Sequence, residues 1–85
     1  MDEVARLLDE FRLLLRRVAD GLVPIDDVEA WHQCHADALR ACDSADVKRA
    51  VQCALVHTWS WRHGSTADVE ARASLRALAG RLPTT

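Results

Sequence analysis

Apolar side chains recur every three or four residues along the first twenty positions of the chain. At about 100° per residue they fall on one side of a helix, and charged residues dominate the other side. The apolar stripe consists of Val4, Leu7, Leu8, Phe11, Leu14, Leu15 and Val18. The pattern predicts an amphipathic helix over about residues 2–20. Gly21 can supply the left-handed residue that often follows a helix, and Pro24 marks the start of the next one.

The same reasoning predicts three further helices, over about residues 25–42, 45–63 and 66–82. No glycine or proline lies between the second and the third, so one long helix over 25–63 is the alternative. The phase argues against it, because the apolar side of the later part is rotated by about 120° from that of the earlier part. Asp43 and Ser44 are good N-cap residues at this point. We therefore expect a tight turn there.

The fourth helix follows residues that favour helix ends. Gly64 ends the third helix, and Ser65 with Asp68 three residues later resembles a capping box. The stripe expected to be buried in the fourth helix consists of Ala67, Ala71, Leu75, Leu78 and Leu82. Short loops between helices favour antiparallel neighbours. The predicted fold is therefore all-α, a compact antiparallel four-helix bundle that forms one domain over residues 1–85.

Composition narrows the class of protein. Hydrophobic residues make up 49% of the 85 positions and the net charge is −2, which argues against a disordered chain. No apolar run approaches the roughly 18 residues of a membrane span, and the acidic N-terminus is not a secretory signal. Three cysteines cannot all pair within the chain, so we expect a reducing, cytoplasmic setting.

The formal charge is unevenly distributed. Residues 20–46 carry seven acids and one arginine, whereas residues 47–85 carry six basic residues and two acids. The basic residues 47–85 could contact phosphate groups, but the net negative charge of the molecule repels a nucleic acid. A helix-turn-helix motif over 45–82 would also lack its characteristic short first helix. The distribution therefore disfavours direct nucleic-acid binding.

One cluster of residues has metal-ligand chemistry: Cys34, His35, Cys53 and His57. Antiparallel pairing about the expected turn brings Cys34 level with Cys53, so a zinc site between two facing helices is conceivable. The spacings match no standard finger, however, and the helical wheel separates Cys34 from His35. The alternatives are a Cys34–Cys53 disulfide, or histidines (His32 and His35) and cysteines that serve only packing.

Nucleophilic catalysis has less support. Cys53 and His57 lie on one helix and point to the same side, without a third orienting group or a glycine-rich turn to form an oxyanion hole. We therefore expect neither an enzyme nor a resident cofactor.

Two features indicate a protein partner. The third predicted helix is apolar on nearly every side, and its flank outside the buried stripe consists of Leu55, Val56, Trp59, Arg62 and His63. This flank is either part of the core or an interface with an aromatic anchor and a polar rim. The second feature is an acidic strip that can steer a basic partner, or that is an ordinary solvated face; it consists of Asp20, Asp26, Asp27, Glu29 and Asp37.

The layout resembles the small four-helix immunity proteins of the colicin D type. A leucine-rich first helix is followed by the segment 20–31, DGLVPIDDVEAW, where the family has a Gly-x-Ile-x-x-x-Glu-Phe-like link and Trp31 stands in for the aromatic residue. The resemblance covers residues 4–82 by architecture more than by motif. It implies a protein that neutralises a tRNA-cleaving toxin by covering its basic active site with acidic residues. It assigns no individual inhibitory residue here, although the acids of the second helix are suitable.

The sequence thus favours a non-enzymatic interaction module, of the inhibitor or immunity type, that blocks a basic, nucleic-acid-handling partner. Phage anti-CRISPR proteins are equally small and equally without motifs. A metal-binding or redox-sensing bundle is one alternative. A homodimeric scaffold that uses the apolar flank of the third helix on both copies is the other.

Overall fold

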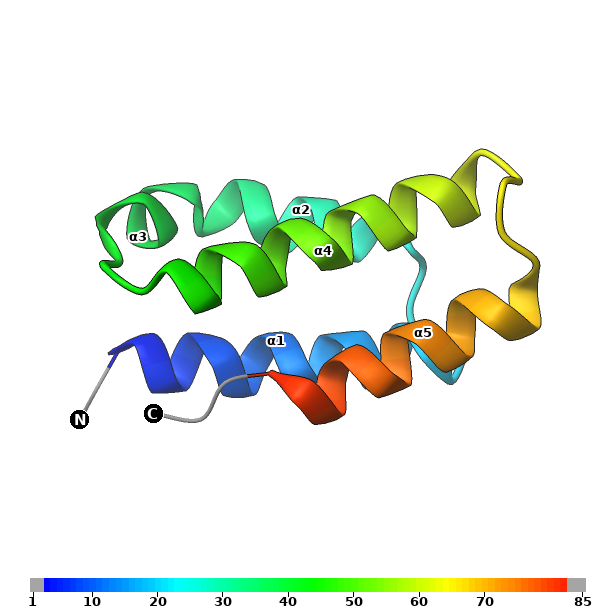
Figure 1. The fold of residues 1–85 in the computed structure, drawn as a ribbon, viewed down its shortest axis with the longest axis horizontal. Coiled ribbons are helices and arrows are strands. Elements are labelled where there is room, and N and C mark those ends of the chain that lie inside the picture. The colour runs from blue at the N-terminus through cyan, green and yellow to red at the C-terminus, as the bar shows by residue number, and fades with distance from the viewer. Residues whose placement is uncertain (1–2, 83–85) are drawn as a thin grey trace.

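The computed structural model describes residues 3–82, and over that range the chain is all-helical (Figure 1). Its helices are α1 (Glu3–Ala19), α2 (Asp26–Cys34), α3 (Ala36–Ala41), α4 (Ala45–Arg62) and α5 (Asp68–Arg81). Residue 2, where the sequence places the start of the first helix, lies outside the described range. No helix of the described chain is long and apolar enough to cross a membrane.

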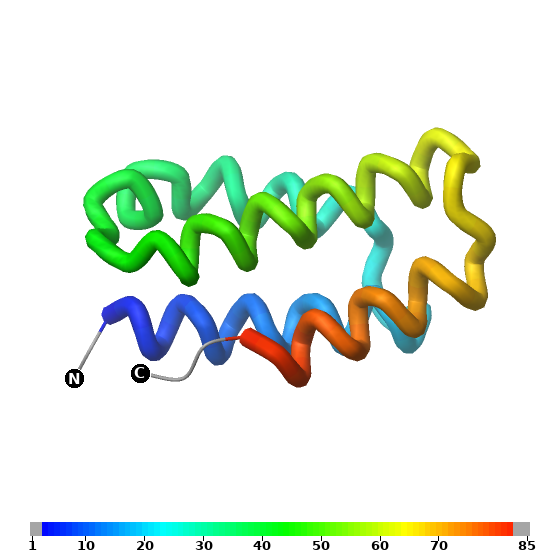
Figure 2. Tube along the Cα trace, viewed as in Figure 1, coloured from blue at the N-terminus to red at the C-terminus, as the bar shows by residue number. Residues whose placement is uncertain are grey.

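The helices form two layers (Figures 1 and 2). One layer holds α1 and α5, which run antiparallel and make the most extensive helix contact in the described part of the chain. The other holds α4 and, antiparallel to it, α2 followed by α3. The radius of gyration of 12.2 Å is close to the roughly 12 Å expected for a compact chain of this length.

The core lies between the layers and takes side chains from every helix of the described range. Phe11 and Leu15 of α1 and Leu75 of α5 are fully buried, and Val28 and Val47 join them from the other layer. The predicted stripe of α1 is confirmed, with Val4 and Leu14 only half-buried. Deleting a side chain of this kind from a close-packed interior costs about 2–5 kcal/mol.

The two expected glycine ends are confirmed. Gly21 follows α1 with φ 77°, and Gly64 follows α4 with φ 75°. In each case the backbone closes the paired hydrogen bonds of a Schellman motif. Leu22 N–H donates to the Arg17 carbonyl at 2.9 Å. Ser65 N–H donates to the Ser60 carbonyl at 2.9 Å.

The expectation of a single second helix over 25–42 is wrong. The chain bends at His35, whose φ and ψ of −111° and 13° leave the helical region, so two shorter helices replace one. The His35 N–H is shared between the carbonyls of Trp31 (3.1 Å) and His32 (3.3 Å). The His35 ring also bonds to the Trp31 carbonyl, at 2.8 Å from Nδ1. These bonds satisfy the carbonyls that a helix leaves free at its end, and the described chain therefore has five helices.

The turn between α3 and α4 is confirmed, and the long helix over 25–63 is excluded. Cys42 is extended, with ψ 130°, and Ser44 is the N-cap of α4, where its hydroxyl accepts from Val47 N–H at 3.3 Å. The capping box expected at Ser65 is wrong. The helix α5 begins at Asp68, and its N-cap Ala67, expected in the core, is exposed.

Candidate functional site

Four of the five residues of the apolar flank of α4 are exposed, whereas Leu55 is half-buried and packs against the core. The buried face of α4 carries Val47, Val51, Ala54 and Thr58. At about 100° per residue, Val56 lies opposite this face and Trp59 lies about 110° around the helix from it. Their exposed fractions are 56% and 58%, so Trp59 is not a core residue.

Trp59 and His63 form one stacked unit at the end of α4. Their ring centroids are 4.2 Å apart and their planes differ by 24°. His63 Nδ1 lies 2.9 Å from the Trp59 carbonyl and caps the helix end. Because stacking and cap hold the indole in place, Trp59 presents a large apolar surface that is already ordered.

A groove between α2 and α4 joins the apolar flank to the acidic residues. It has a volume of about 390 Å³, and its lining includes Glu29 and His32 of α2 and Leu55, Trp59 and Arg62 of α4. A second depression of about 390 Å³ adjoins it at His32 and extends toward Lys48 and Leu39. The apolar flank of α4 and the part of the acidic strip at Glu29, which were inferred separately from the sequence, are therefore neighbours.

Arg62 links those surfaces directly. Its guanidinium lies 2.5 Å from an Asp26 carboxylate oxygen and donates to Glu29 Oε2 at 2.9 Å. The sequence placed Arg62 at the rim of the apolar flank, but the structure pairs it with two acids of the strip. Two carboxylates against one guanidinium leave this end of the groove with a formal charge of −1.

The acidic strip is less free than its formal charge indicates. Asp20 pairs with Arg76 of α5 at 2.9 Å, and Asp37 pairs with Arg40 on its own helix. Asp27 is half-buried, and no ion pair of its carboxylate is found within residues 3–82. The five acids of the expected strip therefore do not form one surface, and the pair Asp26 and Glu29 is the part of it at the groove beside Trp59.

The cysteine and histidine cluster does not assemble. Within residues 3–82, no three His, Cys, Asp or Glu side chains lie close enough to hold a metal ion. Cys34 is exposed, Cys42 is buried and Cys53 is half-buried, and all three are free thiols. The Cys34–Cys53 disulfide is therefore not formed, and the four expected ligands do not converge as a metal site.

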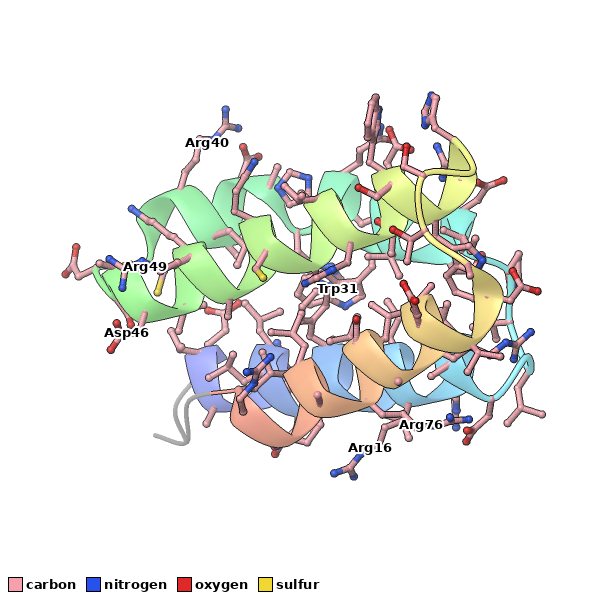
Figure 3. The ribbon with its side chains drawn as sticks, turned by 45° about the vertical axis from the view of Figure 1, so that its right-hand side comes forward. Arg16, Trp31, Arg40, Asp46, Arg49 and Arg76 are labelled. Atoms are coloured by element: carbon pink, nitrogen blue, oxygen red, sulfur yellow. The ribbon has the colours of Figure 1, made fainter. Side chains whose placement is uncertain are left out.

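His35 has a structural position instead. Its ring stacks on Trp31 with centroids 4.5 Å apart, and Trp31 in turn packs on Phe11 at 4.7 Å. Figure 3 shows Trp31 between the two layers. Nε2 of His35 faces Glu10 Oε2 at 3.8 Å. Both nitrogens of His35 thus face protein groups, which is the arrangement expected of a packing histidine rather than of a ligand.

Of the groove residues on α2, the sequence singled out Glu29 as partner-binding but not His32 or Gln33. His32 and Gln33 line the groove opposite Leu55 and Thr58. From the sequence, His32 was considered only as a packing residue, because the neighbour that it faces depends on how α2 packs against α4. The one sequence feature that could have indicated a groove is the regular spacing of the lining residues on α4.

No family model matches this chain, and neither a curated protein nor a solved structure matches it.

Proposed function

We propose that this protein is a non-enzymatic interaction module that binds a partner protein through the exposed flank of α4 and the groove beside it. The observation that carries the proposal is Trp59, 58% exposed and ordered by its stack on His63. Tryptophan is enriched among the residues that dominate binding energy at interfaces.

The partner in this proposal has a basic surface, and its nucleic-acid-handling site is what the module covers. The carboxylates of Asp26 and Glu29 border the same groove as Trp59, so one contact can combine an apolar anchor with acceptors for a basic side chain. Inhibition of the immunity or anti-CRISPR type follows from covering such a site. In this proposal α2 and α3 together form one arm of an antiparallel four-helix bundle, as in colicin D-type immunity proteins, and the protein acts in the cytoplasm.

The test uses Trp59→Ala against Leu13→Ala. Leu13 is a matched control, because it is an apolar side chain on α1 with 48% exposure. Wild-type and variant proteins are crosslinked in cells of the source organism, and the captured protein is then purified and titrated with each. We expect Trp59→Ala to raise the Kd roughly thirtyfold, the effect of a central interface residue. We expect Leu13→Ala to leave it unchanged.

The same titration tests the inhibitory role. Wild-type protein should block nucleic-acid binding or cleavage by the captured partner, and Trp59→Ala should do so only at correspondingly higher concentration. Melting temperatures of the two variants should stay close to that of the wild type, because surface substitutions usually change stability by less than about 0.5 kcal/mol. Equal losses for both variants, or unfolding by Trp59→Ala, would exclude this surface as the interface.

The exposed flank also supports a second candidate, a homodimer through α4. Sedimentation over a hundredfold range of concentration separates the two, since only a dimer dissociates on dilution. A monomer at every concentration favours the hetero-partner.

A further inference from the structure

The lining of the groove on α4 has the spacing of a helix-packing seam. Five of the residues by which α4 lines the two depressions follow one another at intervals of four, three, four and three: Lys48, Gln52, Leu55, Trp59 and Arg62. Val51 and Thr58, which are buried, also line them. An alternating four-three spacing is what one helix presents to another in knobs-into-holes packing. From Lys48 to Arg62 the seam is about 21 Å long at 1.5 Å per residue. A helix of about 15 residues matches that length.

The floor and the rim of the groove suit an amphipathic occupant. Val51 and Leu39 close the floor near Lys48, and Leu55 closes it near Trp59. Val56 and Trp59 rise beside it, and a further shallow depression of about 240 Å³ lies between Gln52 and Trp59. Apolar residues at i, i+3, i+4 and i+7 on one face of an incoming helix would cover this surface.

The two ends of the groove carry opposite charge. At one end Asp26 and Glu29 share the single cation Arg62. At the other, Arg40 is paired with Asp37, while Lys48 is exposed and forms no ion pair with any residue of the range 3–82. The formal charge is therefore −1 at the Glu29 end and +1 at the Lys48 end. This arrangement selects an occupant with a basic side chain at one end and an acidic side chain at the other.

We infer that the groove between α2–α3 and α4 binds a single amphipathic helix of the partner protein, with a basic residue over Asp26 and Glu29 and an acidic residue over Lys48. The inference rests on the proposed function and specifies the form of the partner that it requires. His32 lies where the two depressions meet, and its ring has no hydrogen-bond partner within the described chain. A polar side chain in the middle of the helix would bond to it.

The experiment uses three stapled helical peptides of 15 residues as probes. They share one apolar stripe of leucines at four-three spacing and differ only at their ends, which carry lysine and glutamate, two lysines or two glutamates. Binding to the full protein is measured by fluorescence anisotropy at low ionic strength. We expect the lysine–glutamate peptide to bind about two- to fivefold tighter than either of the others, the range for exposed ion pairs.

A charge reversal provides the decisive comparison. In Lys48→Glu the preferred peptide should become the one with two lysines. Arg16→Glu makes the same kind of change on α1, in the other layer and away from the groove (Figure 3), and should leave the order of the peptides unchanged. Three equal affinities, or a preferred peptide that is the same in both variants, would overturn the assignment.

Two further results bear on the kind of occupant. A proline-rich extended probe with the same end charges should bind at least tenfold more weakly than the lysine–glutamate helix, and tighter binding of the extended probe would overturn the inference. If no peptide binds while Trp59→Ala still loses the captured partner, the inference fails and the interaction function stands. If Trp59→Ala keeps the partner, the proposed function itself fails.

Discussion

Gly21 and Gly64 adopt nearly the same left-handed conformation in different surroundings. A Cβ added at Gly64 would meet no atom within 4 Å, whereas one at Gly21 would lie 3.2 Å from Arg72 Nη1. That guanidinium is held by the Ala19 carbonyl at 2.9 Å and lies 5.5 Å from the centroid of the Trp61 ring. A substitution at Gly21 therefore disturbs a neighbouring helix as well as its own backbone.

We expect Gly64→Ala to lower the free energy of unfolding by about 1–2 kcal/mol, the cost of the left-handed conformation for a residue with a Cβ. Gly21→Ala should cost up to about 1 kcal/mol more, because the Arg72 guanidinium must shift by a few tenths of an ångström and its hydrogen bond to the Ala19 carbonyl is weakened. Urea denaturation of both variants gives the difference. Equal losses of stability in the two variants would mean that Arg72 shifts without a cost in free energy.

The histidines show what a sequence can and cannot establish about a site at this scale. The pairs Trp31–His35 and Trp59–His63 have the same spacing of four residues, and in both the histidine caps its helix by bonding to the tryptophan carbonyl. Residue type and spacing made His35 a reasonable candidate ligand. Its packing role depends on contacts with Glu10 and, through Trp31, with Phe11. These residues of α1 are 24 or more positions away from His35, so the local sequence pattern does not show them.

At the scale of helices, two serines that look alike in the sequence have different positions. Ser44 Oγ accepts from Val47 N–H at 3.3 Å and caps α4. Ser65 belongs to the end of α4, since its N–H bonds back to Ser60. Asp68, its expected partner, instead accepts from Trp61 Nε1 at 2.6 Å. The contact with Trp61 thus overrides a capping box that the local sequence favours.

Ser44→Ala should therefore destabilise the protein by about 1 kcal/mol, the usual cost of removing an N-cap hydroxyl. Ser65→Ala should change stability by no more than about 0.5 kcal/mol, as an exposed substitution without a cap role. Chemical denaturation of the two variants, with circular dichroism to follow helix content, makes the comparison. A larger loss of stability for Ser65→Ala would indicate that Ser65 does cap α5.

Much of the helical framework was predictable because it depends on local periodicity. The bounds of α1 and α4, the turn before Ser44 and both glycine ends follow from the spacing of apolar residues and from end-forming residue types. The bend at His35 was not, since neither glycine nor proline marks it. At the bend, the His35 amide is shared between two carbonyls and the His35 ring stacks on Trp31. These two rings contact Phe11 and Glu10 of α1, which are distant in the sequence.

At the scale of the whole molecule, formal charge and available charge differ. Two arginines, one from α4 and one from α5, offset part of the acidity of residues 20–46, because the fold brings Arg62 to Asp26 and Arg76 to Asp20. Arg72 and Arg76 also donate to the Ala19 carbonyl at the end of α1, and Arg12 donates to the Ala79 carbonyl near the end of α5. Composition counts these charges but cannot show which of them remain available to a partner.

Arg62 occupies the place that a basic group of the partner would take in the proposed complex, so removing its charge should favour association. Arg62→Gln changes the net charge from −2 to −3 and leaves Asp26 and Glu29 without their cation. We expect the association rate with the captured partner, measured by stopped flow, to rise by about two- to fivefold at low ionic strength and to depend more steeply on salt. Arg16→Gln produces the same net charge from the opposite layer and should have a smaller effect. A slower association for Arg62→Gln would mean that the contact of Arg62 with the partner outweighs the gain in negative charge, and equal effects of the two variants would mean that net charge alone governs the encounter.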